Sequence, residues 1–287
     1  MIRLILVLSA VALYLILSLP VLFYLRSLEK KDAAAAALKS LNMVRWILGI
    51  VRNLAGVTCE VRGLENIPKD RAVLYVGNHR SYFDIVMGYT TVPSPTGFIA
   101  KKEMIGIPLL NLWMEQMNCL FLDRANIKEG LKTILIGIEK VKGGVSMWIF
   151  PEGTRNESKD PADLMEFHEG SLKIAEKSGC PVIPVAITGT DDVFERHTPW
   201  IRKSYVIIEY GEPIYLKELP PDKKKFPGAY TRDVISSMLR RQMEEREGKS
   251  FLARYFADYW KTEGLKVRIV SYHIDFEVDK KEYIQAA

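Results

Sequence analysis

A long apolar segment dominates the N-terminal end of the chain. Residues 4–25 carry no charged side chain, and a helix of that length rises about 33 Å, close to the hydrocarbon thickness of a bilayer. This run is longer than the apolar part of an ordinary signal peptide, and no small-residue cleavage site follows it before Arg26. The pattern therefore predicts a retained helix that crosses or deeply enters a membrane.

A second helix is predicted over residues 29–54, where an alanine run, Ala33–Ala37, occurs and proline is absent. Polar positions recur at spacings of three and four and form one stripe, whereas apolar residues cover most of the remaining surface. The stripe consists of Asn42, Arg45, Gly49 and Arg52. Such a helix suits the membrane interface, but it suits equally well a position against a catalytic core.

After Gly56 the pattern changes to short apolar runs that alternate with longer helical stretches, which is typical of an α/β domain. We expect a mixed central sheet flanked by helices, with the loops at strand ends forming the active-site rim. The predicted strands are Val57–Val61, Ala72–Val76, Gly97–Ala100, Cys119–Leu122, Val145–Phe150, Val182–Ile187 and Tyr205–Tyr210. The predicted helices are Phe83–Tyr89, Ile107–Met117, Ile127–Val141 and Gly170–Lys177.

These patterns predict three regions: membrane-associated helices over residues 1–55, a catalytic α/β domain over 56–220 and a helical extension over 221–287. In the extension, a polar helix is expected near Thr231–Glu245. Aromatic and apolar side chains then recur at helical spacing between Phe251 and Trp260. They suit either the lipid headgroup level or packing on the domain.

Composition narrows the functional classes. The 287 residues include 40 Lys+Arg and 35 Asp+Glu, for a net charge of +5. That mild excess suits an anionic membrane or phosphorylated substrates, and the dispersed basic residues match no nucleic-acid-binding module. The three cysteines and four histidines are scattered, without the spacings of a disulfide framework or a metal site. We therefore expect cysteines that are reduced and in the core, no metal, no cofactor and no nucleic-acid partner.

The first candidate for catalysis lies on the turn that follows the second strand. This turn, Val76–Asp84, places His79 five residues before Asp84 and leads into a helix. A carboxylate on one imidazole nitrogen fixes the tautomer, which leaves the other nitrogen free to accept a proton from an attacking hydroxyl. The pair thus has the residues of a general base and its orienter. A structural histidine beside an aspartate is the alternative.

The second candidate is Phe150-Pro-Glu-Gly-Thr-Arg155, where a very apolar strand runs into a glycine-containing turn. Thr154 and Arg155 can donate hydrogen bonds there, and an arginine fork binds phosphate through two oxygens. Gly153 lets the backbone approach an anion closely. A buried clamp between Glu152 and Arg155 is the structural alternative.

Two further blocks end or interrupt strands, Phe121–Arg124 and Val182–Val185. In order and spacing, the four blocks resemble those of the glycerolipid acyltransferase family, which includes the 1-acylglycerol-3-phosphate acyltransferases. The N-H-x-x-x-x-D motif is met by Asn78, His79 and Asp84, and F-P-E-G-T-R by residues 150–155. The similarity covers about residues 70 to 215, and four ordered blocks are more specific than any one of them.

The resemblance implies a glycerophospholipid acyltransferase-like fold in which His79 is the base and Asp84 its orienter. It also implies that Pro184 shapes the acyl side of the site and that Lys101 adds a phosphate contact. Binding of the acceptor's glycerol phosphate is implied for Arg124, Glu152, Gly153 and Arg155, to which the residue pattern adds Thr154. The chain departs from the family pattern at His168, where lysine is common, and at Asn156, where serine is common.

The expected reaction moves a fatty acyl group from acyl-CoA or acyl-carrier protein to lysophosphatidate. The chain has no G-x-S-x-G elbow and no cysteine near His79, so direct attack is simpler than an acyl-enzyme. Membrane lipid is an expected partner. Because Arg26, Lys30 and Lys31 outnumber Arg3 across the apolar segment, we expect a cell-membrane protein whose catalytic domain faces the cytoplasm. The alternatives are another acceptor, namely glycerol 3-phosphate or a larger lysophospholipid, and a non-catalytic lipid-binding protein.

Overall fold

The computed structural model describes the backbone of residues 1–262, 268–270 and 273–275, and side chains through residue 247. Residues 1–238 form one compact unit and residues 239–287 a second. All of the predicted chemistry lies in the first unit.

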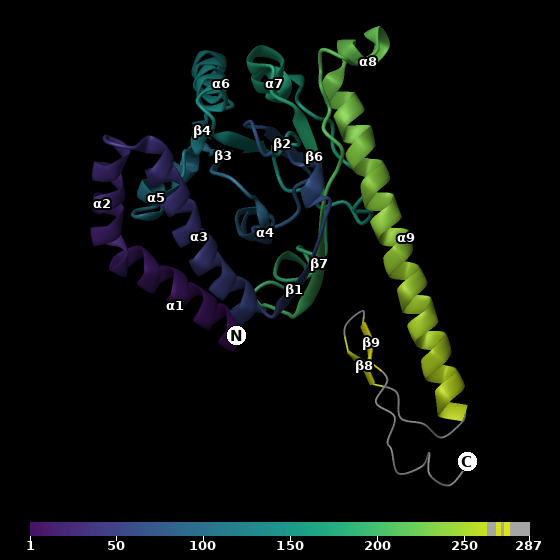
Figure 1. Ribbon diagram of the computed structural model, residues 1–287. Coiled ribbons are helices and arrows are strands. Elements are labelled where there is room, and N and C mark those ends of the chain that lie inside the picture. Colours follow the sequence, from purple (N-terminus) through teal and green to yellow (C-terminus); the bar gives the residue numbers. More distant parts are fainter. Residues whose placement is uncertain (263–267, 271–272, 276–287) are drawn as a thin grey trace. The chain divides into compact units, whose positions relative to one another are not determined.

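The apolar N-terminal segment forms two helices rather than one (Figure 1): α1, Ile2–Leu17, and α2, Leu19–Glu29, which are bent by 54° relative to each other. Pro20 explains the break, because it has no N–H and its ring clashes with the carbonyl of the residue four positions earlier. The Ser18 hydroxyl at the bend accepts a hydrogen bond from Trp113 Nε1 at 2.9 Å. The expectation of one straight helix over residues 4–25 is therefore wrong.

The second predicted helix is α3, Ala33–Ala55, which starts four residues later than expected. The Asp32 side chain caps it by accepting a hydrogen bond from the Ala35 amide at 2.9 Å. It ends at Gly56, whose φ of 77° is left-handed. By length and composition α3 is a candidate membrane span, and α1 and α2 together form a second, bent candidate.

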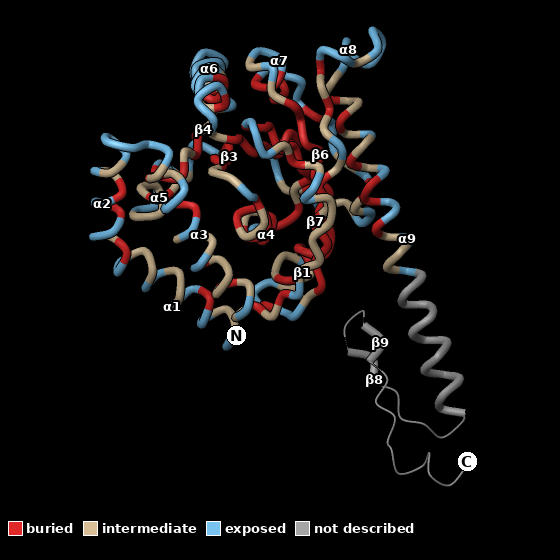
Figure 2. The backbone as a smooth tube through the Cα atoms, viewed as in Figure 1, coloured by how far each residue is buried: buried red, intermediate tan, exposed pale blue. Residues whose placement is uncertain are grey.

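The three helices have two distinct faces (Figure 2). Their inner positions are buried, among them Leu22, Leu25, Leu41 and Val51. Many apolar side chains remain exposed on α1, α2 and α3: Ile2, Ile5, Leu8, Leu13, Ile16, Leu17, Phe23, Tyr24, Leu38 and Trp46. A contiguous stretch of exposed apolar residues of this kind marks a surface that contacts membrane or another apolar partner.

The core of the first unit is a seven-stranded sheet in the order β1-β7-β6-β2-β5-β3-β4. Five strands, β6, β2, β5, β3 and β4, run parallel, whereas β7 is antiparallel to β6 and parallel to β1. The predicted mixed sheet is therefore confirmed. The strands are β1 Val57–Arg62, β2 Leu74–Gly77, β3 Thr96–Lys101, β4 Leu120–Leu122, β5 Ser146–Ile149, β6 Val182–Thr188 and β7 Ser204–Tyr210.

Helices flank the sheet, as predicted: in Figure 1 the sheet lies between α4, Phe83–Thr91, and the pair α6, Ile127–Lys142, and α7, Lys173–Ser178. The α4 side holds a large aromatic core, in which Trp148 stacks on both Tyr75 and Phe98. The shorter elements are α5 Leu110–Gln116, the 3₁₀ turns Leu64–Asn66, Lys102–Gly106, Glu169–Leu172 and Glu195–His197, and α8 Pro221–Lys225.

The C-terminal region begins with α9, Pro227–Thr262, which is much longer than the predicted helix near Thr231–Glu245. Two short strands, β8 Arg268–Val270 and β9 His273–Asp275, form an antiparallel pair that the sequence patterns do not predict. The aromatic side chains between Phe251 and Trp260 lie outside the described side chains. The three-region division at residues 55 and 220 stays a prediction.

Candidate active site

The parallel strands bring the predicted site residues to one edge of the sheet. Because β2, β5, β3 and β4 are parallel neighbours, their carboxyl ends meet there. His79 follows β2, the turn at Phe150–Arg155 follows β5, and Arg124 follows β4. Residues separated by up to 76 positions in the sequence, from His79 to Arg155, thus belong to one rim.

His79 and Asp84 form the expected pair. The imidazole Nδ1 lies 2.8 Å from Asp84 Oδ2, and the side chains are 18% and 0% exposed. Asp84 sits in the first turn of α4, so the short connection from β2 folds it back onto the ring. A carboxylate can only accept, so Nδ1 carries the proton and Nε2 is the basic nitrogen. No hydrogen bond engages Nε2 within the described residues.

The buried carboxylate of Asp84 is held by three more donors. The backbone N–H groups of Arg80 and Ser81 each donate to Oδ2 at 2.8 Å, and the Thr190 hydroxyl donates to Oδ1 at 2.6 Å. Both carboxylate oxygens therefore have hydrogen-bond partners, as is usual for a buried polar group. Asp84 is therefore fixed in orientation, and it can stabilise an imidazolium on His79.

Glu152 points into the protein and supports the base. Its Oε1 accepts from the His79 amide at 3.0 Å, and its Oε2 accepts from Asn156 Nδ2 at 2.8 Å and from the Met165 amide at 3.0 Å. Burial raises the pKa of Glu152, and these donors offset part of the rise. Glu152 is only 3% exposed, and its carboxylate already accepts three hydrogen bonds. Its predicted contact with the acceptor phosphate stays a prediction.

The structural alternative for this turn, a clamp between Glu152 and Arg155, is not formed. Arg155 Nη1 instead donates to Glu195 Oε1 at 3.1 Å, and the guanidinium carbon lies 4.1 Å from the centroid of the Tyr82 ring. Its side chain stays 36% exposed. Arg155 is therefore held on one side and open on the other, as a phosphate-binding arginine requires.

Gly153, in the same turn, contacts Arg124, which follows β4. Arg124 Nη1 donates to the Gly153 carbonyl oxygen, and Gly153 has a φ of +79°. A Cβ at this position would lie 3.0 Å from Arg124 Nη1 and 3.3 Å from His168 Nε2. The residue is thus glycine both for its backbone conformation and for the close approach of two basic side chains.

Of the remaining predicted site residues, Thr154 and Lys101 are exposed and Pro184 is buried. Thr154 is exposed beside Arg155, and Lys101 is exposed at the end of β3. Pro184 lies buried in the middle of β6, where its Cγ would be 2.9 Å from a Cβ on Gly211. The Pro184 side chain is thus directed toward β7 and not toward the rim, and its predicted influence on the acyl side stays a prediction.

A largely apolar cleft of about 490 Å³ opens beside the carboxyl ends of β4 and β5. Phe150, whose ring stacks on His79 at 4.2 Å between centroids, forms part of its wall. Its polar side includes Arg124, Gly153 and His168. The apolar side is formed by Ile99, Leu122, Ile127, Leu131, Ile134 and Ile149. The cleft therefore has a polar end, which includes Arg124, and an apolar end, and Phe150 connects its wall to His79.

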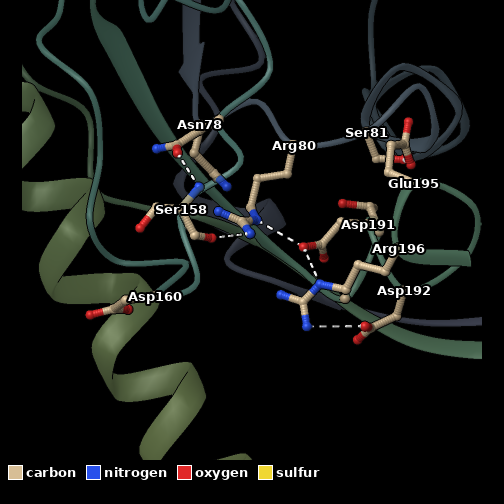
Figure 3. Close-up of polar contacts among 12 residues, drawn as sticks. Asn78, Arg80, Ser81, Ser158, Asp160, Asp191, Asp192, Glu195 and Arg196 are labelled. Carbon is tan, nitrogen blue, oxygen red and sulfur yellow. Dashed lines mark hydrogen bonds and ion pairs between the residues drawn. The ribbon is translucent and has the colours of Figure 1, made fainter.

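The segment that follows β6 is not indicated by the sequence patterns. Thr190, Asp191 and Glu195 contact residues of both candidate motifs. Figure 3 shows Asp191 beside Arg80 and Glu195 beside Ser81. The available signal was their position, because polar residues directly after a buried parallel strand lie on the same rim as those after β2 and β5. The sequence patterns indicate only residues 182–185 of this block, which lie inside β6.

Comparisons with known proteins agree with this geometry. A family model described as Acyltransferase matches residues 58–188. The 1-acyl-sn-glycerol-3-phosphate acyltransferase of Borreliella burgdorferi is 30% identical over 204 residues, which cover 71% of this chain and 77% of that protein. The Escherichia coli protein of the same name is 26% identical over 205 residues, covering 70% of this chain and 82% of that protein.

A solved structure is also similar, that of the 1-acyl-sn-glycerophosphate (LPA) acyltransferase PlsC from Thermotoga maritima. The TM-score is 0.69 at 27% identity, and the match covers 84% of this chain and 95% of that chain.

Proposed function

Because the chain belongs to the acyltransferase family, we propose that it transfers a fatty acyl group from a thioester donor to the free hydroxyl of 1-acyl-glycerol 3-phosphate, giving phosphatidate. The resemblance read from the four sequence blocks is confirmed at the level of the family. The acceptor follows the names of the relatives, and acyl-CoA and acyl-carrier protein are the two candidate donors.

One observation carries the proposal: the 2.8 Å contact between His79 and the buried Asp84 leaves Nε2 unengaged on the rim that also carries Arg155. Phe150, which stacks on His79, lines an apolar cleft. A protein that only bound lipid headgroups would need the cations but not a base with its orienter. This arrangement has the three parts that acylation of a lysophospholipid requires, which are a proton acceptor, a phosphate site and space for an alkyl chain.

In the proposed reaction, the acceptor hydroxyl attacks the thioester carbonyl while His79 Nε2 takes its proton. Asp84 stabilises the imidazolium that forms. When the tetrahedral intermediate collapses, the carbon–sulfur bond breaks and the leaving thiolate takes the proton from His79. The base is thereby restored, no covalent enzyme intermediate is needed, and atoms and charge balance.

Arg155 and Arg124 are proposed to bind the acceptor phosphate, with Thr154 and Lys101 at the margin of the same site. The open side of the Arg155 guanidinium can hold two phosphate oxygens at once. Gly153 keeps the space beside Arg124 and His168 free of a side chain. Glu152 contributes by fixing the turn and the His79 backbone.

The membrane contact is proposed to be made by the exposed apolar faces of α1, α2 and α3, with the catalytic domain on the cytoplasmic side. The acceptor and product are lipids, so an enzyme held at the membrane meets both without extracting them into water. The thioester donor then arrives from the cytosol.

The experiment is an acyl-transfer assay of the full chain in lipid vesicles, with free thiol as the readout. Lysophosphatidate, monoacylglycerol, glycerol 3-phosphate and a lysophospholipid with a larger headgroup serve as acceptors. Thiol release and phosphatidate formation that need lysophosphatidate and disappear in His79→Ala are expected. Equal release with every acceptor, or release that persists in His79→Ala, would contradict the proposal.

A further inference from the structure

The loop that follows β6, residues 189–196, lies against both catalytic segments. It contains two almost completely buried polar residues, Thr190 and Asp191, at 1% and 5% exposure. Buried polar side chains are retained only when their hydrogen bonds are satisfied. Each of these two contacts a different part of the site, as does Glu195 at the other end of the loop.

Thr190 acts on the base. Its hydroxyl donates to Asp84 Oδ1 at 2.6 Å, whereas His79 and the two backbone amides use Oδ2. Among the residues that the structure describes, Thr190 is thus the side-chain donor to the second carboxylate oxygen. It fixes the rotation of the carboxylate and withdraws negative charge from it.

Glu195 acts on the phosphate side. Its Oε1 accepts from Arg155 Nη1 at 3.1 Å and from the Tyr82 amide at 2.8 Å. Its Oε2 accepts from the Ser81 hydroxyl at 2.6 Å. One carboxylate therefore connects the segment that carries His79 to the arginine of the turn after β5.

A buried ion pair joins the two ends of this arrangement (Figure 3). Arg80 Nε donates to Asp191 Oδ2 at 3.0 Å, and Arg80 Nη2 donates to the Ser158 carbonyl oxygen at 2.7 Å. Arg196 Nε binds the same Asp191 oxygen at 2.8 Å. Arg80, next to His79, is therefore bonded both to the loop through Asp191 and to the chain after Arg155 through Ser158.

We propose that the loop over residues 189–196 is a third part of the active site, in which Thr190 positions the base through Asp84 and Glu195 positions Arg155 for the acceptor phosphate. The inference rests on the proposed function. Neither residue touches the reacting atoms, so both are positioning residues. They should be separable by kinetics, because one acts on proton transfer and the other on acceptor binding.

Thr190→Val removes the hydroxyl and keeps the shape, and Thr190→Ser keeps the hydroxyl. We expect Thr190→Val to lower kcat about tenfold, a typical effect of one hydrogen bond to a charged group, with KM for lysophosphatidate unchanged. Without this donor the Asp84 carboxylate attracts the imidazolium proton more strongly, so the acid limb of the pH profile of kcat/KM moves to higher pH. Thr190→Ser should retain both kcat and the limb.

The charged side chains that face His79 are Asp84 from α4 and Glu152 from the turn after β5. Thr190→Val leaves both residues in place and removes only the hydrogen bond to Asp84. If Thr190 had only a structural role, Thr190→Val would lower the melting temperature and the amount of active enzyme. The acid limb of the pH profile of kcat/KM would then stay in place. That result, or a Thr190→Val enzyme with wild-type kcat and pH profile, would overturn the assignment to the base.

Glu195→Gln keeps an acceptor for the Tyr82 amide and a polar contact for Ser81, but it removes the charge that holds Arg155. We expect KM for lysophosphatidate to rise about three- to thirtyfold, the range for a weakened charge-assisted contact. The donor KM and kcat should stay near wild type. Glu157→Gln is the matched control, because Glu157 is an exposed carboxylate two residues after Arg155. This variant should leave KM for lysophosphatidate unchanged.

A fall in KM would instead mean that Glu195 competes with the phosphate for Arg155, and it would overturn the positioning role. Equal losses with every acceptor, including monoacylglycerol, would do so as well. These results differ from failure of the proposed function itself, which appears in His79→Ala and in the acceptor panel while the loop residues are intact.

Discussion

The ring of Phe150 lies nearly parallel to the imidazole of His79, with 4.2 Å between centroids and 13° between planes. Phe150 directly follows β5 and begins the turn that carries the second motif, so His79 packs directly on that turn. In the proposed reaction, the hydroxyl and the phosphate of one acceptor would therefore meet one small region of the protein.

Removal of the base should abolish most turnover without unfolding the protein. We expect His79→Ala to lower kcat by at least about a hundredfold, the usual effect of losing a general base, because alanine has no group that can accept the proton. Asp84→Asn should also reduce kcat, since the amide can impose the wrong tautomer. Initial rates in vesicles and circular dichroism test this, and near wild-type turnover in a well-expressed His79→Ala would refute the role of the base.

Loss of Arg155 should weaken the use of the acceptor more than the use of the donor. A charge-assisted hydrogen bond contributes about 1.5 to 3 kcal/mol, so Arg155→Ala should lower kcat/KM for lysophosphatidate about ten- to a hundredfold or more while the donor KM is nearly unchanged. Arg155→Lys should rescue this only partly, because a point charge lacks the fork. The half-exposed pair with Glu195 makes a small stability contribution. A large fall in melting temperature with uniform losses for all acceptors would argue for a structural arginine.

Membrane binding should depend on the exposed apolar residues of the N-terminal helices. Deletion of residues 1–26 should move much of the protein to a soluble or aggregated fraction, but it would also remove packing around Leu22 and Trp113. The cleaner variant is Leu13→Gln, Leu17→Gln and Phe23→Gln together, because all three side chains are more than half exposed.

This triple variant should lose vesicle binding in flotation assays at a nearly unchanged melting temperature. The matched control, Leu13→Met, Leu17→Met and Phe23→Leu, keeps the apolar surface and should bind as wild type. Full flotation of the glutamine variant would show that another surface holds the protein at the membrane.

The cysteines should be inert to alkylation. Cys119 is buried, and Cys59 and Cys180 are half-buried rather than fully in the core as predicted. Burial raises the pKa of all three thiols, that of Cys59 to about 11. Because a thiol ionises only as the pH approaches its pKa, the Cys59 thiolate is well under about one part in a thousand at pH 7.5. Iodoacetamide at that pH should leave the rate unchanged, and rapid inactivation would reopen the case for a cysteine nucleophile.

The sheet and the histidine–aspartate pair could be predicted because local patterns specify them. Short apolar runs give the strands, and the five-residue step from His79 to Asp84 closes onto the first turn of α4. The bend at Ser18 could have been inferred from Pro20, but hydropathy alone does not register it. The partner of Arg155 could not be predicted, since Glu195 is 40 residues away and reaches it only through the order of β6 and β2 in the sheet.

The bonding of Glu152 has a consequence for how the enzyme responds to temperature. Its buried carboxylate joins the His79 amide, the Asn156 side chain and the Met165 amide, so the turn is ordered before any substrate arrives. The entropy lost in ordering this turn thus belongs to folding of the domain and not to substrate binding. Warming should therefore leave the turn ordered until the domain melts, and activity should disappear in one cooperative step instead of declining gradually as a loop unfolds locally.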